Sequence, residues 1–352
     1  MSLSQHPLNA KFPKSNGKLQ YFHDIGRVLA KSPSNPEALA DYISTGVPQL
    51  GLHIISFQDA TVVTLTWLHT LLDAMGRHAL LRAWTAVLEG RDDDVPEFLG
   101  YDTNPLADLG ATEVSQKDEF LLKKKLLGGL GMRTSSRSKS RRTSISTPWS
   151  SRNSHIVMLG RERSPFISDG DILTAWFTRL IASTNPTVTS SSPTRTITIM
   201  NVLGMRDILR TAPPLLPRST QGVYIHNCAA AIFSHFTVAD FLAKPLGHIA
   251  AQLRSDLVRQ STREKVEAAA RIARDNGGMA FATIVGGTAG TYVERTRGKP
   301  TFIHVYTTLA PGLSLRGSGN CVGRDAHGNW WLGTIMRAEF VEGFRRAAEG
   351  MS

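Results

Sequence analysis

Hydrophobic and polar positions change their period around residue 70 of the chain. Residues 52–57 and 61–68 are rich in β-branched and aromatic side chains and enclose a short polar stretch, which predicts two strands joined by a tight turn. Beyond Asp73 the apolar residues fall on one helical face until Gly90, so the pattern predicts a helix that stops there. A shorter helix followed by a turn is predicted over 38–49. This part of the chain therefore predicts the order strand, strand, turn and helix, with a histidine in the turn.

From residue 155 onward, strand-like and helix-like patterns alternate. Strands are predicted over 155–160, 194–202 and 223–236, and two more within 321–336 around a Gly-Asn turn. Helices are predicted over 168–182, 237–257, 263–278 and 338–349. Two of them begin with a capping-box pattern, in which Ser168 is followed by Asp171 and Thr237 by Asp240. Pro245 is expected either to kink its helix or to lie near the start of one.

Length and composition favour an α/β protein of about two domains. The chain has 352 residues, and 41% of them are hydrophobic, which is enough for a sizeable core. No apolar run approaches the ~20 residues of a membrane span, and the N-terminus lacks the apolar segment of a signal peptide. The two cysteines, Cys228 and Cys321, are too few for a disulfide framework, so a reducing compartment fits best. Both lie in predicted strands and are expected to be buried. We therefore expect a cytoplasmic protein with no membrane partner.

Positive charge is concentrated in one stretch of the chain. The formal net charge is +11, and much of the excess lies within residues 123–152, which are rich in Ser and Arg and poor in periodic apolar residues. Residues 133–155 are therefore predicted to be a flexible crossover linker between two units, 1–132 and 156–352. A nucleic-acid-binding arm, and hence a regulator, is the alternative for this stretch. Because aromatic and basic residues do not interleave elsewhere, we expect no nucleic-acid partner.

The motif TWLHTLLDAMG, residues 66–76, contains the strongest candidate chemistry. His69 follows a predicted strand, where an imidazole can project into a cleft and remove a proton from a hydroxyl or an amine. Asp73, four residues later, is expected to hold the turn, and Gly76 is expected to let the chain bend without a Cβ clash. The alternative is an ordinary histidine at the start of a helix, with Asp73 near the N-cap. The spacing alone leaves both interpretations open.

Other catalytic and metal-binding patterns are missing from the sequence. No G-x-G-x-x-G follows a predicted strand, and neither a P-loop nor a G-x-S-x-G nucleophile elbow is present. The cysteines and histidines do not show the spacing of a zinc site, so no metal is expected.

The neighbourhood of His69 resembles the motif region of the BAHD acyltransferases, and it is most similar to their fungal branch of trichothecene acetyltransferase-like enzymes. The resemblance starts with QLGLHIISFQDATVVTLTWLHTLLDAMG and the helix that follows. It continues, in order, through FISDGDILTAWFTRLIA (166–182), MNVLGMRDIL (200–209), VYIHNCAAAIF (223–233) and VGRDAHGNWWL (322–332). It covers most of the chain from about residue 20 onward. Ordered matches of this kind are far more specific than the HxxxD spacing.

The resemblance implies an α/β fold of two chloramphenicol-acetyltransferase-like domains with mixed sheets, and a channel between them that reaches the histidine from both sides. It also implies a mechanism, in which His69 is the general base that activates an acceptor hydroxyl for attack on the thioester carbonyl of an acyl-CoA, with acetyl-CoA as the expected donor. Neither a covalent acyl-enzyme nor a metal is needed. Asp73 would support the motif by bonding Arg206, the position that matches the family's arginine. The expected partners are acyl-CoA and a small-molecule alcohol from fungal secondary metabolism, and the protein is expected to be a monomer.

The chain departs from the family pattern in two places. The segment before His69 is shorter than in the family, so the N-terminal domain is expected to be shortened by a strand and a helix. The family's Asp-Phe-Gly-Trp-Gly motif is absent, and residues 296–314 occupy roughly its place. These departures leave open a catalytically degenerate member that acts as a binding or scaffold protein. His226, beside Asn227, is expected to be structural or to line the channel rather than to act as a second base.

Overall fold

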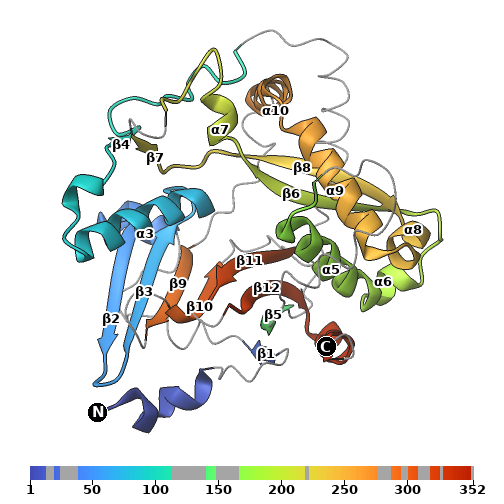
Figure 1. The fold of residues 1–352 in the computed structure, drawn as a ribbon, viewed down its shortest axis with the longest axis horizontal. Helices are drawn as coiled ribbons and strands as arrows, with labels where there is room; N and C mark the ends of the chain where they lie inside the picture. The colour runs from blue at the N-terminus through green and yellow to red at the C-terminus, as the bar shows by residue number, and fades with distance from the viewer. Residues whose placement is uncertain are drawn as a thin grey trace.

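The computed structural model describes ten ranges of the chain, which together form a mixed α/β arrangement (Figure 1). The described ranges are 1–12, 20–23, 39–111, 140–147, 166–218, 222–275, 287–294, 300–307, 318–325 and 328–349. The predicted α/β class is confirmed. The predicted strand 155–160 lies outside the described residues, as do residues 133–139 and 148–155 of the predicted linker. Of residues 296–314, only 300–307 are described.

One antiparallel sheet carries the His69 motif at the end of a central strand. Its order is β10 (Pro300–Thr307), β9 (Gly287–Glu294), β3 (Thr61–Leu68), β2 (Leu50–Ser56). The predicted hairpin of β2 and β3 is confirmed, with Leu50 opposite Trp67 and Ser56 opposite Thr61. On its other side β3 pairs along its whole length with β9, which comes more than two hundred residues later. Segments from the two ends of the chain therefore hold β3 in place.

Helix α3 (Ala74–Leu88) packs on this sheet directly after the motif (Figure 1). The alternating inward residues of β3, including Leu65 and Trp67, form a cluster with Leu72 of the turn, and Leu80 and Leu81 of the helix pack against it. The predicted helix is confirmed. Gly90 follows its end with φ of 70°, a left-handed conformation that favours glycine. The short helix α2 (Leu39–Thr45), also predicted, precedes β2.

A second antiparallel sheet has the order β1 (Gln20–His23), β5 (Ser140–Thr147), β12 (Trp330–Arg337), β11 (Ser318–Arg324). The prediction of a flexible linker is wrong for β5, which pairs with β12 from Ser140 opposite Arg337 to Thr147 opposite Trp330. Its polar composition hides the strand, because the partner that stabilises it is almost two hundred residues away. The predicted hairpin of β11 and β12 is confirmed. Cys321 lies on β11 at the edge of the sheet and is exposed, so its predicted burial is wrong.

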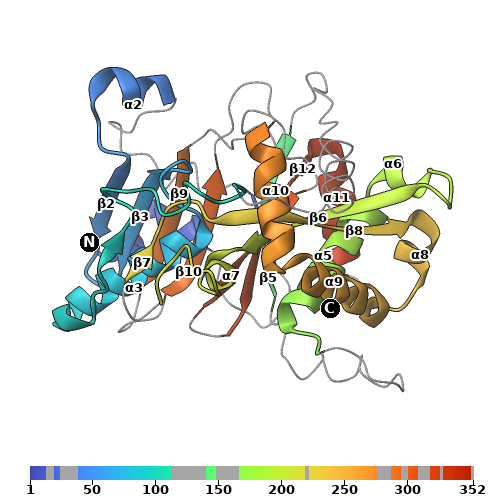
Figure 2. The same cartoon turned by 90° about the horizontal axis from the view of Figure 1, so that it is seen from above.

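The C-terminal helices pack on a two-stranded ribbon of β6 (Thr196–Gly204) and β8 (Ala229–Thr237) (Figures 1 and 2). They are α5 (Asp169–Ser183), α6 (Pro186–Thr189), α8 (Val238–Ala243), α9 (Leu246–Gln260) and α10 (Arg263–Asp275). The capping box at Ser168 is confirmed, since its side chain accepts from the Asp171 amide and the Asp171 carboxylate accepts from the Ser168 amide. The predicted helix 237–257 is two helices, and Pro245 stands at the start of the second, which is one of the two outcomes expected.

The predicted strand 223–236 is broken in the middle. Residues Val223–Tyr224 form β7, which pairs in parallel with β4 (Phe98–Leu99), and β8 begins only at Ala229. The interruption at 225–228 is the segment that meets the His69 motif. Helix α7 (Arg206–Leu209) follows β6, and its first residue, Arg206, lies beside the segment 225–228 and the His69 motif.

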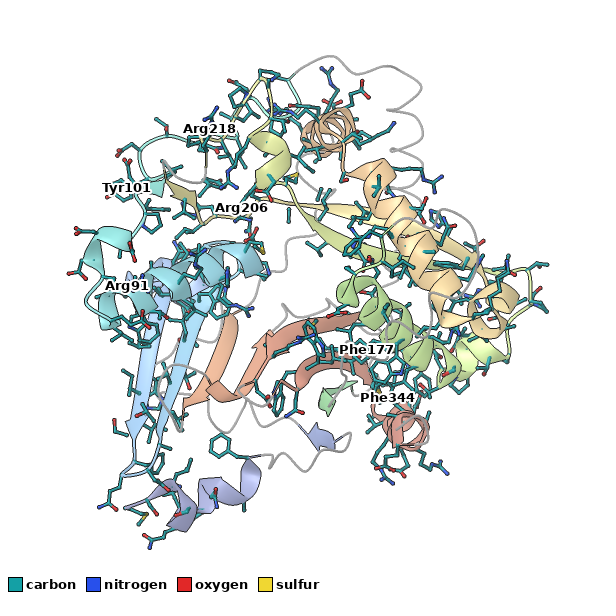
Figure 3. The ribbon with its side chains drawn as sticks, viewed as in Figure 1. Arg91, Tyr101, Phe177, Arg206, Arg218 and Phe344 are labelled. Carbon is teal, nitrogen blue, oxygen red and sulfur yellow. The ribbon has the colours of Figure 1, made fainter. Side chains whose placement is uncertain are left out.

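The remaining described elements are short. Within the described ranges, 3-10 helices occupy Leu3–Gln5, Pro7–Lys11, Asp92–Asp94 and Ala338–Phe340, and α11 (Val341–Glu349) follows the last of them. Phe344 of α11 contacts Phe177 of α5 edge-on, with ring centroids 6.2 Å apart (Figure 3). Leu3 is fully buried in a cluster with Val62 of β3 and Trp331 of β12, which ties the two four-stranded sheets together. Across the described parts of the chain, no helix has the length and apolar character needed to cross a membrane.

Candidate active site

The turn between β3 and α3 presents His69 and Asp73 in different ways. His69 comes directly after the last residue of β3 and is half-buried. Asp73 is the N-cap of α3, with an extended backbone, and its Oδ1 accepts from the amide of Gly76 at 2.8 Å. An N-cap carboxylate satisfies a free amide of the first helical turn and favours the helix dipole. The N-cap placement considered as an alternative for Asp73 is therefore present, and it coexists with the ion pair described next.

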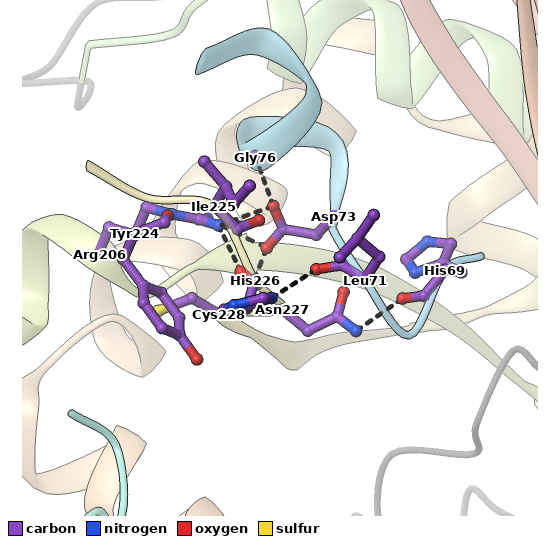
Figure 4. A network of polar contacts seen from close by, with 10 residues as sticks. All are labelled: His69, Leu71, Asp73, Gly76, Arg206, Tyr224, Ile225, His226, Asn227 and Cys228. Carbon is purple, nitrogen blue, oxygen red and sulfur yellow. Dashed lines mark hydrogen bonds and ion pairs between the residues drawn. The ribbon is translucent and has the colours of Figure 1, made fainter. Parts of the chain in front are cut away.

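Arg206 forms a bidentate ion pair with the Asp73 carboxylate (Figure 4). Its Nη1 donates to Oδ2 at 3.0 Å and its Nη2 to Oδ1 at 2.9 Å, and both residues are less than one-tenth exposed. The amide of Cys228 gives Oδ2 another hydrogen bond, at 2.9 Å. Arg206 directs its other donors to the carbonyls of Tyr224, at 2.8 Å, and His226, at 2.7 Å. A buried ion pair needs such additional bonds to offset its desolvation, and here both partners have them.

Three consecutive residues, which we call the anchoring segment (226–228), bond to alternate residues of the turn (Figure 4). The Nδ1 of His226 donates to the carbonyl of Leu71 at 2.8 Å. The side-chain amide of Asn227 donates to the carbonyl of His69 at 2.7 Å. The Cys228 amide donates to Asp73, as described above, so the anchoring segment bonds to residues 69, 71 and 73 of the turn. These pairs are more than one hundred and fifty residues apart in sequence, so no local pattern could have indicated them.

Gly76 is required for close approach rather than for a bend. A Cβ added there would lie 1.8 Å from the carbonyl oxygen of Ile225, far inside any possible contact. Its φ is not among the positive values that favour glycine in this chain. The predicted importance of Gly76 is therefore supported, but the predicted bend is not its cause: the missing side chain lets α3 touch the backbone just before the anchoring segment.

Cys228 and His226 have structural environments. Cys228 is fully buried, and burial raises the pKa of its thiol to about 11, with the nearby Asp73 carboxylate adding to the shift. Such a thiol is protonated at neutral pH and is a poor nucleophile. The His226 ring packs edge-on against Tyr224, with centroids 5.4 Å apart, while its Nδ1 is used by Leu71. This arrangement agrees with a structural assignment for His226.

The polar groups of the site thus divide into fixed and available ones. The Asp73 carboxylate and the Arg206 guanidinium form hydrogen bonds with each other. Asp73 also bonds to the first turn of α3, and both bond to the segment 224–228. Among the described residues, the hydrogen bond found for His69 uses its backbone carbonyl and leaves the imidazole out of the network. Within the ten described ranges, no group of three or more His, Cys, Asp or Glu side chains is arranged to hold a metal ion.

Comparison with known proteins identifies the family. No protein-family model matches the chain. Among curated proteins, the transcriptional regulator calD of Penicillium decumbens is 31% identical over 386 residues, covering 96% of this chain and 76% of calD. The acetyltransferase adrJ of Penicillium roqueforti is 30% identical over 390 residues, with the same coverage of each chain. The chain belongs to the fungal trichothecene acetyltransferase-like branch of the BAHD acyltransferases.

Solved structures place this BAHD chain in the expected fold. The F. graminearum TRI101 structure, complexed with coenzyme A and T-2 mycotoxin, superposes with a TM-score of 0.59. The match covers 90% of this chain and 78% of TRI101, at 12% identity. At that identity the likeness speaks for the fold alone. The family resemblance and the α/β fold expected from the sequence are both confirmed by these comparisons.

Proposed function

We propose that this protein is an acyl-CoA-dependent O-acyltransferase that acylates a hydroxyl of a fungal secondary metabolite, with acetyl-CoA as donor and His69 as general base. One observation carries the proposal: in the HTLLD turn (residues 69–73), the Asp73 carboxylate is fully bonded to structural partners, whereas the hydrogen bond described for His69 uses its main-chain carbonyl and not its ring. The named acetyltransferase among its relatives and the coenzyme A in the TRI101 complex supply the substrate class. We propose that it acts as a monomer on acyl-CoA and a small alcohol.

The proposed reaction needs only one proton-transferring residue. The neutral imidazole of His69 accepts the proton of the acceptor hydroxyl as its oxygen attacks the thioester carbonyl. The tetrahedral intermediate then collapses, the ester forms, the carbon–sulfur bond breaks, and the CoA thiolate takes the proton from the imidazolium. No protein nucleophile takes part, and the high pKa of the Cys228 thiol argues against that residue as one.

We retain the proposed division into 1–132, a crossover over 133–155, and 156–352, with two chloramphenicol-acetyltransferase-like domains. In this proposal the Asp73–Arg206 pair and the anchoring segment join the two units beside the reacting histidine. Under this division the later unit also contributes to the sheet that carries His69, because β9 pairs with β3.

The proposal is tested by assaying CoA release from acetyl-CoA in the presence of a panel of polycyclic alcohols. His69→Ala is expected to lower kcat by ~10²–10⁴-fold, the usual effect of losing a general base. His78→Ala is a matched control, because His78 is exposed on α3 within the same helix–turn unit. A His69→Ala enzyme with the wild-type rate would refute His69 as base.

A second candidate is a binding or regulatory protein on the same fold. The observation that favours it is the name of calD, a transcriptional regulator that is 31% identical to this chain. This candidate predicts binding of acyl-CoA without turnover, and equal binding by wild type and His69→Ala in calorimetry. If the protein bound DNA directly, its affinity would have to fall as salt rises, because phosphate contacts release counterions. Turnover that depends on His69 would exclude a purely binding role.

A further inference from the structure

Asn227 is the member of the anchoring segment that touches His69 itself. Its side-chain Nδ2 donates to the His69 carbonyl at 2.7 Å (Figure 4). Strand β3 ends one residue earlier, with Leu68 opposite Gly287, so the His69 carbonyl lies beyond the hydrogen-bonded ladder of the sheet. Among the side chains of the described ranges, Asn227 provides the hydrogen bond that fixes this peptide. An amide from a distant segment therefore helps to fix the peptide group that follows the imidazole-bearing Cα.

The backbone of Asn227 is itself rigidly held. The carbonyl of the preceding residue, His226, accepts from Arg206 at 2.7 Å. The amide of the following residue, Cys228, donates to Asp73, and the Cys228 carbonyl accepts from the amide of Met205 at 2.9 Å. The buried Asp73–Arg206 pair thus fixes both neighbours of Asn227. Because its backbone is held in this way, Asn227 can fix the position of the His69 carbonyl to which its side chain donates.

From this geometry we propose that Asn227 is a positioning residue for His69, which it orients through the His69 main-chain carbonyl. The inference rests on the proposed function of His69 as general base. The buried Asp73–Arg206 pair then has two roles. It holds the turn through Asp73, and it helps to position His69 because it fixes the backbone on both sides of Asn227. Asn227 is exposed, so its hydrogen bond contributes little to global stability, and its loss can affect alignment while the fold is kept.

The expected kinetic effect is a fall in kcat with little change in substrate binding. A base displaced by about an ångström can lose up to ~10²-fold in rate. We expect Asn227→Ala to lower kcat by about 10- to 100-fold while the KM for acetyl-CoA changes by less than about twofold. Asn227→Asp removes the donor and places a carboxylate beside His69. Because a nearby negative charge favours the imidazolium, the acidic limb of the kcat profile should move to higher pH in this variant.

The experiment compares wild type, Asn227→Ala, Asn227→Asp and the matched control Asn185→Asp. Asn185 caps α6 by accepting from the Thr187 amide, a role that a carboxylate keeps, and α6 lies at the far side of the molecule from the HTLLD turn (Figure 1). Each variant is measured for kcat, KM, pH profile and Tm. The inference predicts a kcat loss for both Asn227 variants at near wild-type Tm and none for the control. A kcat within about twofold of wild type for Asn227→Ala would overturn it.

A second readout does not depend on turnover. In protein labelled with ¹³C-histidine, the His69 imidazole signal is assigned by its loss in His69→Ala. In Asn227→Ala this signal should shift or broaden, and an unchanged signal would overturn the inference. If wild type shows no acyl transfer, or His69→Ala keeps its rate, the proposed function fails, and the imidazole signal alone then decides whether Asn227 orients His69.

Discussion

At the scale of the residue, Asp73 and His69 differ in how fully they are bonded. The Asp73 carboxylate accepts from Gly76, Cys228 and both ends of Arg206, so the structure gives it no free capacity for substrate. His69 contributes its carbonyl to the network and leaves its ring outside it. These bonds give Asp73 a structural role and leave the His69 ring available for its proposed role as general base.

Removing one partner of the buried pair should strongly destabilise the fold. Arg206→Met leaves the Asp73 carboxylate buried without a cation and is expected to lower the free energy of unfolding by about 3–5 kcal/mol, measured by urea denaturation. The control is Arg345→Met, which breaks exposed pairs with Glu342 and Glu349 on α11 and should have little effect. Equal destabilisation by the two variants would show that the buried Asp73–Arg206 pair contributes no more to the free energy of unfolding than the exposed pairs do.

The Cys228 thiol predicts a pH dependence of stability. Its pKa is raised to about 11 in the folded protein by burial, whereas in the unfolded chain it ionises near its ordinary value. A raised pKa stabilises the fold below the unfolded pKa, and that contribution is lost as the pH rises toward the folded value. The free energy of unfolding should therefore fall between about pH 9 and pH 11. Cys228→Ala should show a shallower fall over this window, and an unchanged slope would contradict the assignment.

At the scale of the element, the helix α3 approaches the segment 225–228 through the space left by Gly76. We expect Gly76→Ala to force the two apart, because the added Cβ would overlap the Ile225 carbonyl, and to lower both Tm and acyl transfer. Gly343→Ala is the matched control, since it places a Cβ within helix α11 where nothing lies within 4 Å. That variant should gain about 0.5–1 kcal/mol from helix propensity. A neutral Gly76→Ala would refute the close approach.

Elements stabilised by nearby residues could be predicted from the sequence, and elements stabilised by distant ones could not. The hairpin of β2 and β3, helix α3 and the capped start of α5 follow from local periodicity and capping. Strand β5 is polar and depends on β12 for its pairing, so its composition resembled a linker. The apolar run after Val223 predicted one strand. In the structure the carbonyls of Tyr224 and His226 accept hydrogen bonds from Arg206 instead of pairing with a neighbouring strand, so the strand is interrupted there.

The same distinction holds within the site. The spacing in the HTLLD turn and the family resemblance pointed to His69, Asp73 and Arg206 before any coordinates. The roles of Asn227 and Gly76 required knowledge of what lies opposite them, namely the His69 carbonyl and the Ile225 carbonyl. Contacts of this kind are set by the packing of remote segments, which a single sequence does not encode locally.

At the scale of the whole molecule, the chain has a net charge of +11 and its proposed co-substrate carries several phosphate charges. A positively charged surface attracts such a ligand, and salt screens that attraction. We expect the KM for acetyl-CoA to rise as sodium chloride is increased from low to high concentration, while kcat changes less. A KM that is independent of ionic strength would show that the net charge does not help to bind the co-substrate.

The proposed function depends above all on His69 acting as the general base, in a turn that Asn227, His226 and Arg206 hold in place. The most direct test is the initial rate of CoA release by His69→Ala, measured with the acceptor that wild type uses best, at a temperature where both proteins are folded. We predict a rate lower by ~10²-fold or more at an unchanged Tm. A His69→Ala protein that is folded and releases CoA as fast as wild type would contradict the assignment of His69 as the base.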